Sequence, residues 1–169
     1  MSDDRDGGDD YEQIRSLVYA YAELIDEGDF DGVADLFQHA TLVAGDGSEF
    51  RGRETLRNLW AGAVRLYDGG LPNTRHVITN VNVKLAADRT TATSQSYVTV
   101  MQAVPGLPLQ AVAVSIHRDT FAKVDRAWRF VERRDRQALV GDLSRHMHGV
   151  AAPDAAGSDA AAAGDGAEG

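Results

Sequence analysis

The sequence predicts one cone-shaped α+β domain, in which three N-terminal helices pack on a curved antiparallel sheet that encloses a pocket. Two observations lead to this prediction. Hydrophobic residues first recur at helical spacing, and from Arg75 onward the period changes to two and stays there. Turn signals separate the segments of period two, so neighbouring strands are expected to pair as antiparallel hairpins. Helices followed by a β-meander are typical of the α+β class.

Three segments carry the helical pattern before the sheet begins. Residues 11–27 place hydrophobic side chains on one face, and Gly28 follows where a helix would end. A short second helix is expected over residues 30–37 and a third over residues 52–67, with a short strand at residues 41–44 between them. A sheet that curves around the first helix would let side chains from both point into the pocket.

Four long segments have the alternating pattern of half-buried strands. They read HVITNVNVKL, TATSQSYVTVMQAV, LQAVAVSIHRDTFAKV and AWRFVERRD. The turns between them are indicated by Ala87-Asp88, by PGLP at residues 105–108 and by Asp125-Arg126.

The two ends of the chain carry most of its charge. The formal net charge is −9, of which residues 1–10 and residues 150–169 contribute −4 each. The second end is rich in Ala, Gly and Asp, so it cannot bury enough apolar surface to offset the entropy of ordering. We therefore expect a disordered acidic N-terminus at residues 1–10, one domain at residues 11–149 and a disordered tail at residues 150–169.

The nearly neutral domain argues against several classes of partner. Nucleic acids and anionic membranes both require a basic patch, and neither is expected to bind. No apolar run approaches the ~20 residues that span a bilayer, and the acidic start does not match a secretory signal. The absence of cysteine fits a reducing cytoplasm. No metal-ligand spacing and no phosphate-binding loop occurs, so no metal or other cofactor is expected.

Asp26 and His76 are the main candidates for chemistry. Asp26 lies on the apolar side of the first helix beside Leu24 and Ile25, where a charge needs a partner. His76 stands at the start of the first long strand, on a face that the alternation alone does not assign. An ionised Asp26 that binds one imidazole nitrogen would fix the tautomer and leave the other nitrogen free to take a proton. The alternatives are an exposed carboxylate at the helix end and a structural histidine.

The order of elements and three segments resemble the nuclear transport factor 2-like superfamily, and within it the SnoaL-like domains. The segments are YAELID in the first helix, RHVITNV at the start of the sheet and IHRDTFAKVDRAWRFVERR at its end. The resemblance covers about residues 11–140. An Asp at the end of the first helix with a His in that strand is similar to scytalone dehydratase, the bile acid dehydratases and hexachlorocyclohexane dehydrochlorinase. That subgroup performs eliminations.

The resemblance also implies roles for other residues. Tyr21 resembles the pocket tyrosine of the bile acid branch, whose phenol can hydrogen-bond a substrate; otherwise it is a core residue. Arg133, five residues after Trp128, matches the inward arginine of the dehydrochlorinase; otherwise it belongs to a solvated strand edge. His117 replaces an aromatic residue that is usual in the family, and is expected as a second acid, a hydrogen-bond donor to the substrate or an exposed residue.

Three remaining residues are assigned by type and place. Trp60 is expected in the core or in the pocket wall, where it would contact the substrate. His146 and His148 lie near the tail, without a carboxylate cluster at ligand spacing, and are expected to be solvated.

The resulting hypothesis is a cofactor-independent lyase, a dehydratase, that acts on a hydrophobic cyclic or polyketide-like small molecule of secondary metabolism. His76 would be the base and Asp26 its orienter. One alternative is an isomerase, cyclase or epoxide-opening enzyme with Asp26 as the direct base in the same pocket. Another is a module that binds a small molecule without turnover.

A homodimer or homotrimer is expected, because one face of the curved sheet is left outside the pocket. The apolar residues that are candidates for burial there are Val98, Val100, Val112 and Val114.

Overall fold

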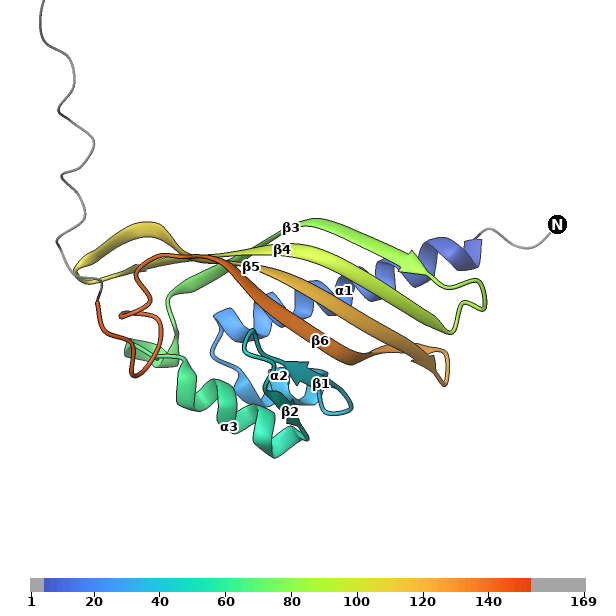
Figure 1. The fold of residues 1–169 in the computed structure, drawn as a ribbon, viewed down its shortest axis with the longest axis horizontal. Helices are drawn as coiled ribbons and strands as arrows, with labels where there is room; N and C mark the ends of the chain where they lie inside the picture. Colours follow the sequence, from blue (N-terminus) through green and yellow to red (C-terminus); the bar gives the residue numbers. More distant parts are fainter. Residues whose placement is uncertain (1–4, 153–169) are drawn as a thin grey trace, which may run out of the picture.

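The computed structural model describes residues 5–152, so most of the expected disordered tail and residues 1–4 lie outside the described residues. It contains three α-helices and six strands within this range, in the order that Figure 1 shows. The elements are α1 (Arg5–Asp26), α2 (Phe30–Leu36), β1 (Thr41–Val43), β2 (Glu49–Arg51), α3 (Arg53–Ala63), β3 (Thr74–Leu85), β4 (Thr91–Val104), β5 (Leu107–Val124) and β6 (Ala127–Val140).

The predicted α+β architecture is confirmed. The sheet has the order β2-β1-β6-β5-β4-β3, and β3 to β6 form the antiparallel meander expected from the turn signals. The whole sheet is mixed, because β1 pairs parallel with β6 while β2 folds back antiparallel on β1. The short hairpin of β1 and β2 thereby covers the edge of β6, which would otherwise present unpaired backbone groups.

The first helix is longer than the sequence pattern indicates. It begins at Arg5, inside the segment 1–10 that was expected to be disordered. Asp10 explains part of the difference, because it is buried and accepts hydrogen bonds from Lys123, Arg89 and Trp128. An acidic residue in an acidic segment gives no sign of this burial until the partners, about 80 to 120 residues later in the chain, are placed around it.

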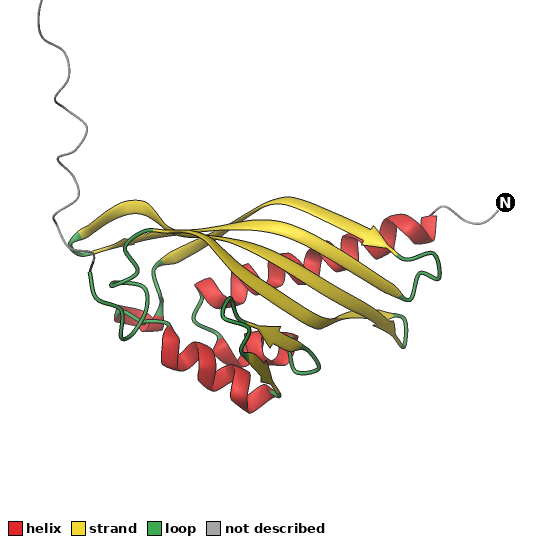
Figure 2. Ribbon diagram, in the orientation of Figure 1, coloured by secondary structure: helices red, strands yellow, loops and turns green. Residues whose placement is uncertain are grey.

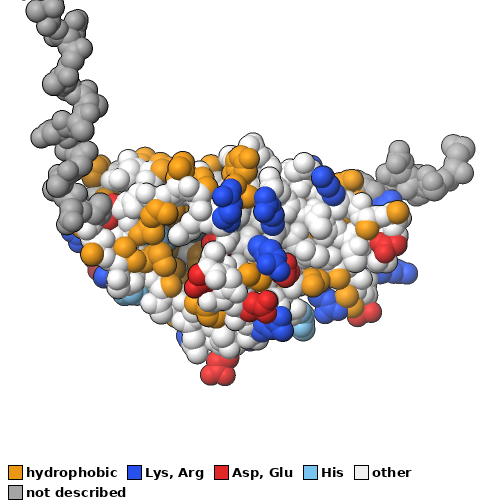
Figure 3. All heavy atoms as spheres, viewed as in Figure 1, with side chains coloured by type: hydrophobic (Ala, Val, Ile, Leu, Met, Phe, Trp, Pro, Cys, Tyr) orange, Lys and Arg blue, Asp and Glu red, His pale blue; other side chains and the backbone are white. Residues whose placement is uncertain are grey.

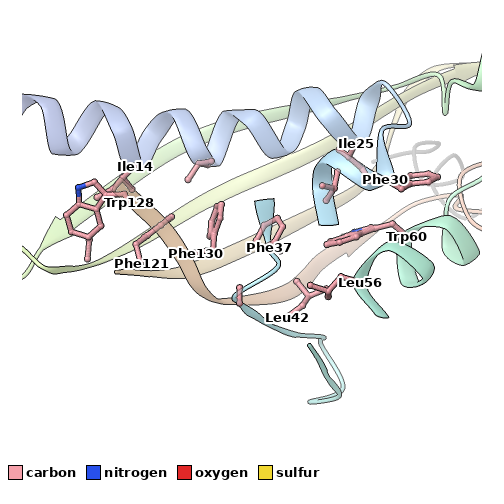
Figure 4. Packing of buried hydrophobic residues seen from close by; sticks show 14 of the residues in the cluster. Ile14, Ile25, Phe30, Phe37, Leu42, Leu56, Trp60, Phe121, Trp128 and Phe130 are labelled. Atoms are coloured by element: carbon pink, nitrogen blue, oxygen red, sulfur yellow. The ribbon is translucent and has the colours of Figure 1, made fainter. Parts of the chain in front are cut away.

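The sheet curves over the three helices, as the secondary-structure colouring of Figure 2 makes plain. The curvature is helped by register shifts in each long strand pair, one of them at Asn80, which has φ of +52°. Buried aromatic and aliphatic side chains fill the space between the three helices and the sheet, as Figure 4 shows. The central pocket lies between α1, α3 and the meander.

A glycine fixes the place where α1 ends. Gly28 has φ of +71°, and a Cβ on it would lie 2.5 Å from the carbonyl oxygen of Gly70. Only glycine fits this backbone conformation and this close approach. The turn places Asp26, in the last position of α1, beside the start of β3.

Candidate active site

Asp26 and His76 form a hydrogen-bonded pair in the structure. His76 Nδ1 lies 2.6 Å from Asp26 Oδ1, and the backbone N–H of His76 donates to Asp26 Oδ2 at 2.7 Å. Thr74 Oγ1 donates a third hydrogen bond to Asp26 Oδ1 at 2.7 Å. The side chains of Asp26 and His76 are 9% and 6% exposed. The exposed carboxylate considered for Asp26 is therefore wrong.

The carboxylate of Asp26 is held in its ionised form. Burial raises its pKa, but the hydrogen bonds from His76 and Thr74 and the charge of His76 outweigh burial, so the pKa lies below its usual value. An ionised Asp26 requires a proton on His76 Nδ1, which leaves Nε2 unprotonated in the neutral ring. No described residue forms a hydrogen bond with Nε2, and the imidazole lines the pocket.

This central pocket has a volume of about 310 Å³. Its walls are mostly apolar, and Trp60 of α3, which is 8% exposed, contributes to them as expected. Eight polar or charged side chains also line it. They are Tyr21, His76, Ser115, His117, Arg133, Asp135, Gln137 and His146.

Tyr21 connects the Asp26–His76 pair to the β5–β6 side of the pocket. Its ring centroid lies 5.8 Å from that of His76 and 5.7 Å from that of His117, with edge-on geometry in both cases. Burial raises the pKa of the Tyr21 phenol to about 12, so the phenol is a hydrogen-bond donor at neutral pH. Tyr21 also packs on Phe37, and so belongs to the core and to the pocket.

Arg133 is buried, 2% exposed, rather than part of a solvated strand edge. Its Nε and Nη2 donate to the two carboxylate oxygens of Asp119 at 2.7 and 2.9 Å. The guanidinium also stacks 4.5 Å from the ring centroid of Tyr21 and 4.8 Å from that of Phe37. Its third nitrogen, Nη1, is buried with no hydrogen-bond partner among the described residues.

His117 is also buried, with 4% exposed, so the exposed alternative is wrong. Burial lowers its pKa well below the usual value, with further lowering by the positive charge of Arg133 and by that of His76 when His76 is protonated, so the ring of His117 is neutral. Its Nε2 lies 3.7 Å from Asp135 Oδ1, and its Nδ1 has no partner among the described residues. His117 and Asp135 are register partners on β5 and β6, which can be recognised only once the strand pairing is known.

Asp135 and His146 are pocket residues that sequence reasoning missed. Burial raises the pKa of Asp135, against the hydrogen bond from Ser115 and the charge of Arg133. Asp135 stands in a run of charged residues. Because the register shifts near Ser115, alternation along the strand does not show which face of the sheet Asp135 is on. His146, expected to be solvated, is only 8% exposed, whereas His148 is exposed as predicted.

Other kinds of site are not found in the part of the chain that the structure describes. No group of three or more His, Asp or Glu side chains there is placed to hold a metal ion. No described helix is long and apolar enough to cross a membrane. On the face drawn in Figure 3, charged side chains of both signs lie among hydrophobic ones, and the face is not uniformly basic.

An α+β cone with a pocket between a curved sheet and an N-terminal helix is the architecture of the nuclear transport factor 2-like, or cystatin-like, fold. Residues 8–134 match the SnoaL-like domain, and the chain belongs to this family. No curated protein is detectably similar to the chain in sequence.

Several solved structures share the fold. Rv3472 from Mycobacterium tuberculosis, a protein of unknown function, is 25% identical, with 77% of this chain and 72% of that chain covered and a TM-score of 0.63. A provisionally named scytalone dehydratase from Novosphingobium aromaticivorans is 20% identical, with 90% and 97% covered and a TM-score of 0.67. The hexachlorocyclohexane dehydrochlorinase LinA-type3 from Novosphingobium barchaimii is 15% identical, with 88% and 97% covered and a TM-score of 0.65. At these identities the last two show a common fold.

Proposed function

We propose that the protein is a cofactor-independent lyase, a dehydratase, that removes water from a hydrophobic cyclic or polyketide-like molecule in the central pocket. The observation that carries the proposal is the Asp26–His76 pair, whose free imidazole nitrogen belongs to a ring in the pocket wall. The likeness in fold to a provisionally named scytalone dehydratase and to a dehydrochlorinase supports an elimination.

The chemistry follows from the tautomer that Asp26 fixes. His76 Nε2 takes the proton from the carbon next to a substrate carbonyl, and the C–H electrons form the new double bond. The C–O bond to the hydroxyl on the adjacent carbon breaks, and the oxygen leaves with its electrons after receiving a proton. The imidazolium can return the abstracted proton to this oxygen, so that one group serves both halves of a syn elimination and water is released.

The alternative in which Asp26 is the direct base has less support. Asp26 Oδ1 is engaged by His76 and Thr74, and Oδ2 accepts from the backbone of His76. A base needs a lone pair aimed at the substrate, and Asp26 does not line the central pocket. An isomerase or cyclase with His76 as its base would still use this pocket. A binding module without turnover is the remaining alternative, and the assay below distinguishes it.

A suitable probe is 3-hydroxy-1-tetralone, a bicyclic β-hydroxyketone that yields fluorescent 1-naphthol when it loses water. We expect the wild-type protein to accelerate this reaction. His76→Ala and Asp26→Ala should each lower kcat by roughly 10²- to 10⁴-fold, and the double variant should lose little more, because the two residues act as one unit. Asp26→Asn should fold normally and remain impaired, because an amide cannot offset the charge of the imidazolium.

The controls for this experiment are two. Leu66→Ala removes an exposed side chain outside the central pocket and should leave turnover unchanged. Thermal unfolding of every variant separates a lost base from a lost fold. A folded His76→Ala protein with near wild-type turnover would move the base elsewhere, and binding without turnover in the wild type would favour the binding module.

We further propose that the protein acts in the cytoplasm as a homodimer or homotrimer. Of the four valines expected on the outer face of the sheet, only Val114 lies there, because Val98 and Val100 line the pocket and Val112 is buried. The register instead places a row on the outer face across four strands, each residue paired with the next: Val77, Thr99, Val114 and Leu139. Val77 and Leu139 are 45% and 68% exposed, which supports association through this face.

A further inference from the structure

The chain crosses one end of the central pocket after β6. Residues 141–149, here called the closing segment, are attached to the end of α3 by backbone hydrogen bonds. Arg65 N donates to His146 O at 2.9 Å, and His148 N donates to Ala63 O at 2.8 Å. Arg65 Nε also donates to the carbonyl of Met147 at 2.9 Å. The closing segment is thus fixed to α3 from His146 to His148.

Side chains fasten the same segment to the sheet and to the loop after α3. Gln102 of β4 donates to the carbonyl of Arg145 at 3.2 Å, and the hydroxyl of Tyr67 donates to the same carbonyl. Leu143 and Met147 of the segment line the central pocket together with His146. The position of the His146 ring is therefore set by the fold, since the backbone on each side of it is tied down.

The imidazole of His146 is buried but only partly satisfied. It is 8% exposed, and its Nδ1 has no hydrogen-bond partner among the described residues. Burial lowers its pKa to about 4, with a further lowering by the charge of His76 and a smaller opposing effect of Asp26. The ring is therefore neutral at pH 7, with one N–H donor and one acceptor nitrogen. Leu143 and Met147 pack in one cluster with Val100, the register partner of His76, so this segment lies on the side of the pocket that holds the Asp26–His76 pair.

Orphaned polar atoms gather around this pocket. Of the six buried side-chain atoms without a partner among the described residues, four belong to residues of the pocket lining. They are His117 Nδ1, Arg133 Nη1, Asp135 Oδ1 and His146 Nδ1. A buried polar atom without a partner is costly, and such atoms are rare in folded proteins unless they serve a function. Their concentration in one cavity indicates that a ligand supplies the missing hydrogen-bond partners.

We propose that His146 is a ligand-binding residue whose Nδ1 forms a hydrogen bond with an oxygen of the molecule in the central pocket, beside the Asp26–His76 pair. A second oxygen of the same molecule is bound by Arg133 Nη1 and His117 on the β5–β6 side. The inference rests on the proposed function only in taking the central pocket as the ligand site.

The charges in the pocket narrow the ligand further. The positive charge of Arg133 is balanced by the carboxylate of Asp119, to which it donates two hydrogen bonds. The rings of His117 and His146 are neutral. Asp26 is ionised, so no uncompensated positive charge faces the cavity. A carboxylate or phosphate ligand is therefore disfavoured. A cavity of about 310 Å³ holds roughly ten water molecules, which corresponds to a molecule of one or two rings. The ligand class is a small, neutral, apolar ring compound with two oxygen functions.

The test uses three variants of the full chain with different geometry at the same site. Asn presents an amide nitrogen close to the position of the histidine Nδ1, whereas Gln reaches the position of Nε2. His146→Asn should therefore retain binding, while His146→Gln and His146→Leu should lose it. A useful probe is 1,3-dihydroxynaphthalene, which does not react and carries two oxygens, with naphthalene as the matched ligand that carries none.

The expected result is a weakening of 1,3-dihydroxynaphthalene binding by roughly three- to tenfold in His146→Leu and His146→Gln, and by less than about twofold in His146→Asn. Naphthalene should bind all four proteins equally. In the wild type, the probe should shift the imidazole Nδ1 resonance of His146 in ¹⁵N NMR spectra. Because His146→Leu removes an orphaned polar atom, its thermal midpoint should equal or exceed that of the wild type.

Three outcomes would overturn the inference, and a fourth would reject only the proposed function. Equal binding of the probe by wild type and His146→Leu would show that His146 makes no such contact. A clear fall in the thermal midpoint of His146→Leu with unchanged binding would make the residue structural. No binding of the probe to the wild type would reject this ligand class. Binding with the expected NMR shift but no dehydration of 3-hydroxy-1-tetralone would leave the inference standing and reject the proposed function.

Discussion

Asp119 and Arg133 illustrate, at the scale of single residues, how the pocket holds a cation inside an aromatic core. The two side chains are 0% and 2% exposed, and each satisfies the other with two parallel hydrogen bonds. Removing one partner leaves an isolated buried charge, which is far worse than removing both. The pair therefore fixes where Arg133 Nη1 points, and with it the β5–β6 side of the pocket.

We predict that Asp119→Leu lowers the free energy of unfolding by about 3 to 5 kcal/mol, because Arg133 would remain buried without its counter-ion. The double variant Asp119→Leu with Arg133→Met should regain much of this loss. Urea unfolding at pH 7 measures both values. A single variant that is as stable as the wild type would mean that water reaches Arg133 and that the pair contributes little.

The sequence predicts some site residues and cannot predict others. Asp26 and His76 were identified because a charge on an apolar helix face and a histidine at a strand start need partners, and the family pattern joins them. His146 could not be identified, since its burial depends on where the closing segment crosses the pocket. The faces of Val98 and Val100 were assigned wrongly, because alternation shows that two faces exist but not which one is inside.

At the scale of elements, Asp10 attaches the N-terminal half of α1 to the far ends of the long strands. It accepts hydrogen bonds from Lys123 of β5 at 2.6 Å, from Trp128 of β6 at 2.9 Å and from Arg89 in the turn after β3 at 2.8 Å. Burial raises the pKa of Asp10, but these three donors outweigh it and lower the pKa to about 2. The lowered pKa means that the ionised form stabilises the fold.

We predict that Asp10→Asn lowers the free energy of unfolding at pH 7 by about 2 kcal/mol, since it weakens hydrogen bonds between charged groups. The folded pKa of about 2 lies below the unfolded value near 3.8, so the contribution is complete above about pH 5 and is lost as the pH falls toward 2. The difference between variant and wild type should shrink over this range in urea unfolding. A difference that stays constant with pH would show that the charge of Asp10 is not its source.

The long elements with a strong period, the short helix α2 and the short strand β1 were predictable, whereas β2 and the long-range pairings were not. The pattern located α1 and the four strands of the meander, because each repeats its period over ten residues or more. The strand β2 has three residues, Glu49–Arg51, and carries no period of its own. Its pairing with β1, and that of β1 with β6, arises from the need to cover an edge of the sheet.

At the scale of the whole molecule, one face of the sheet is covered by the helices and the other is exposed to solvent. The helices cover the concave side of the sheet, and the central pocket lies there. The outer side carries the row of Val77, Thr99, Val114 and Leu139. Tyr97, two residues before Thr99 on the same strand, lies next to this row and is 39% exposed. A face of this kind costs free energy in water, because aromatic and aliphatic side chains stay hydrated. A second copy of the chain would cover it.

The last prediction concerns this association. A stable dimer buries about 800 Å² on each partner, which the width of four paired strands can supply. The full-length protein should therefore show a dimer or trimer mass in light scattering at micromolar concentration. Val77→Lys should dissociate it, since a charge within the apolar contact would be desolvated without a partner.

Leu66→Lys is the matched control, because Leu66 is 44% exposed but belongs to the loop after α3 rather than to the outer face of the sheet. It should keep the mass of the wild type. Because the dyad and the closing segment lie on the opposite side of the sheet, the dissociated Val77→Lys protein should retain ligand binding if it remains folded. A monomeric wild type would contradict the association, and a Val77→Lys protein of unchanged mass would place the contact on another surface.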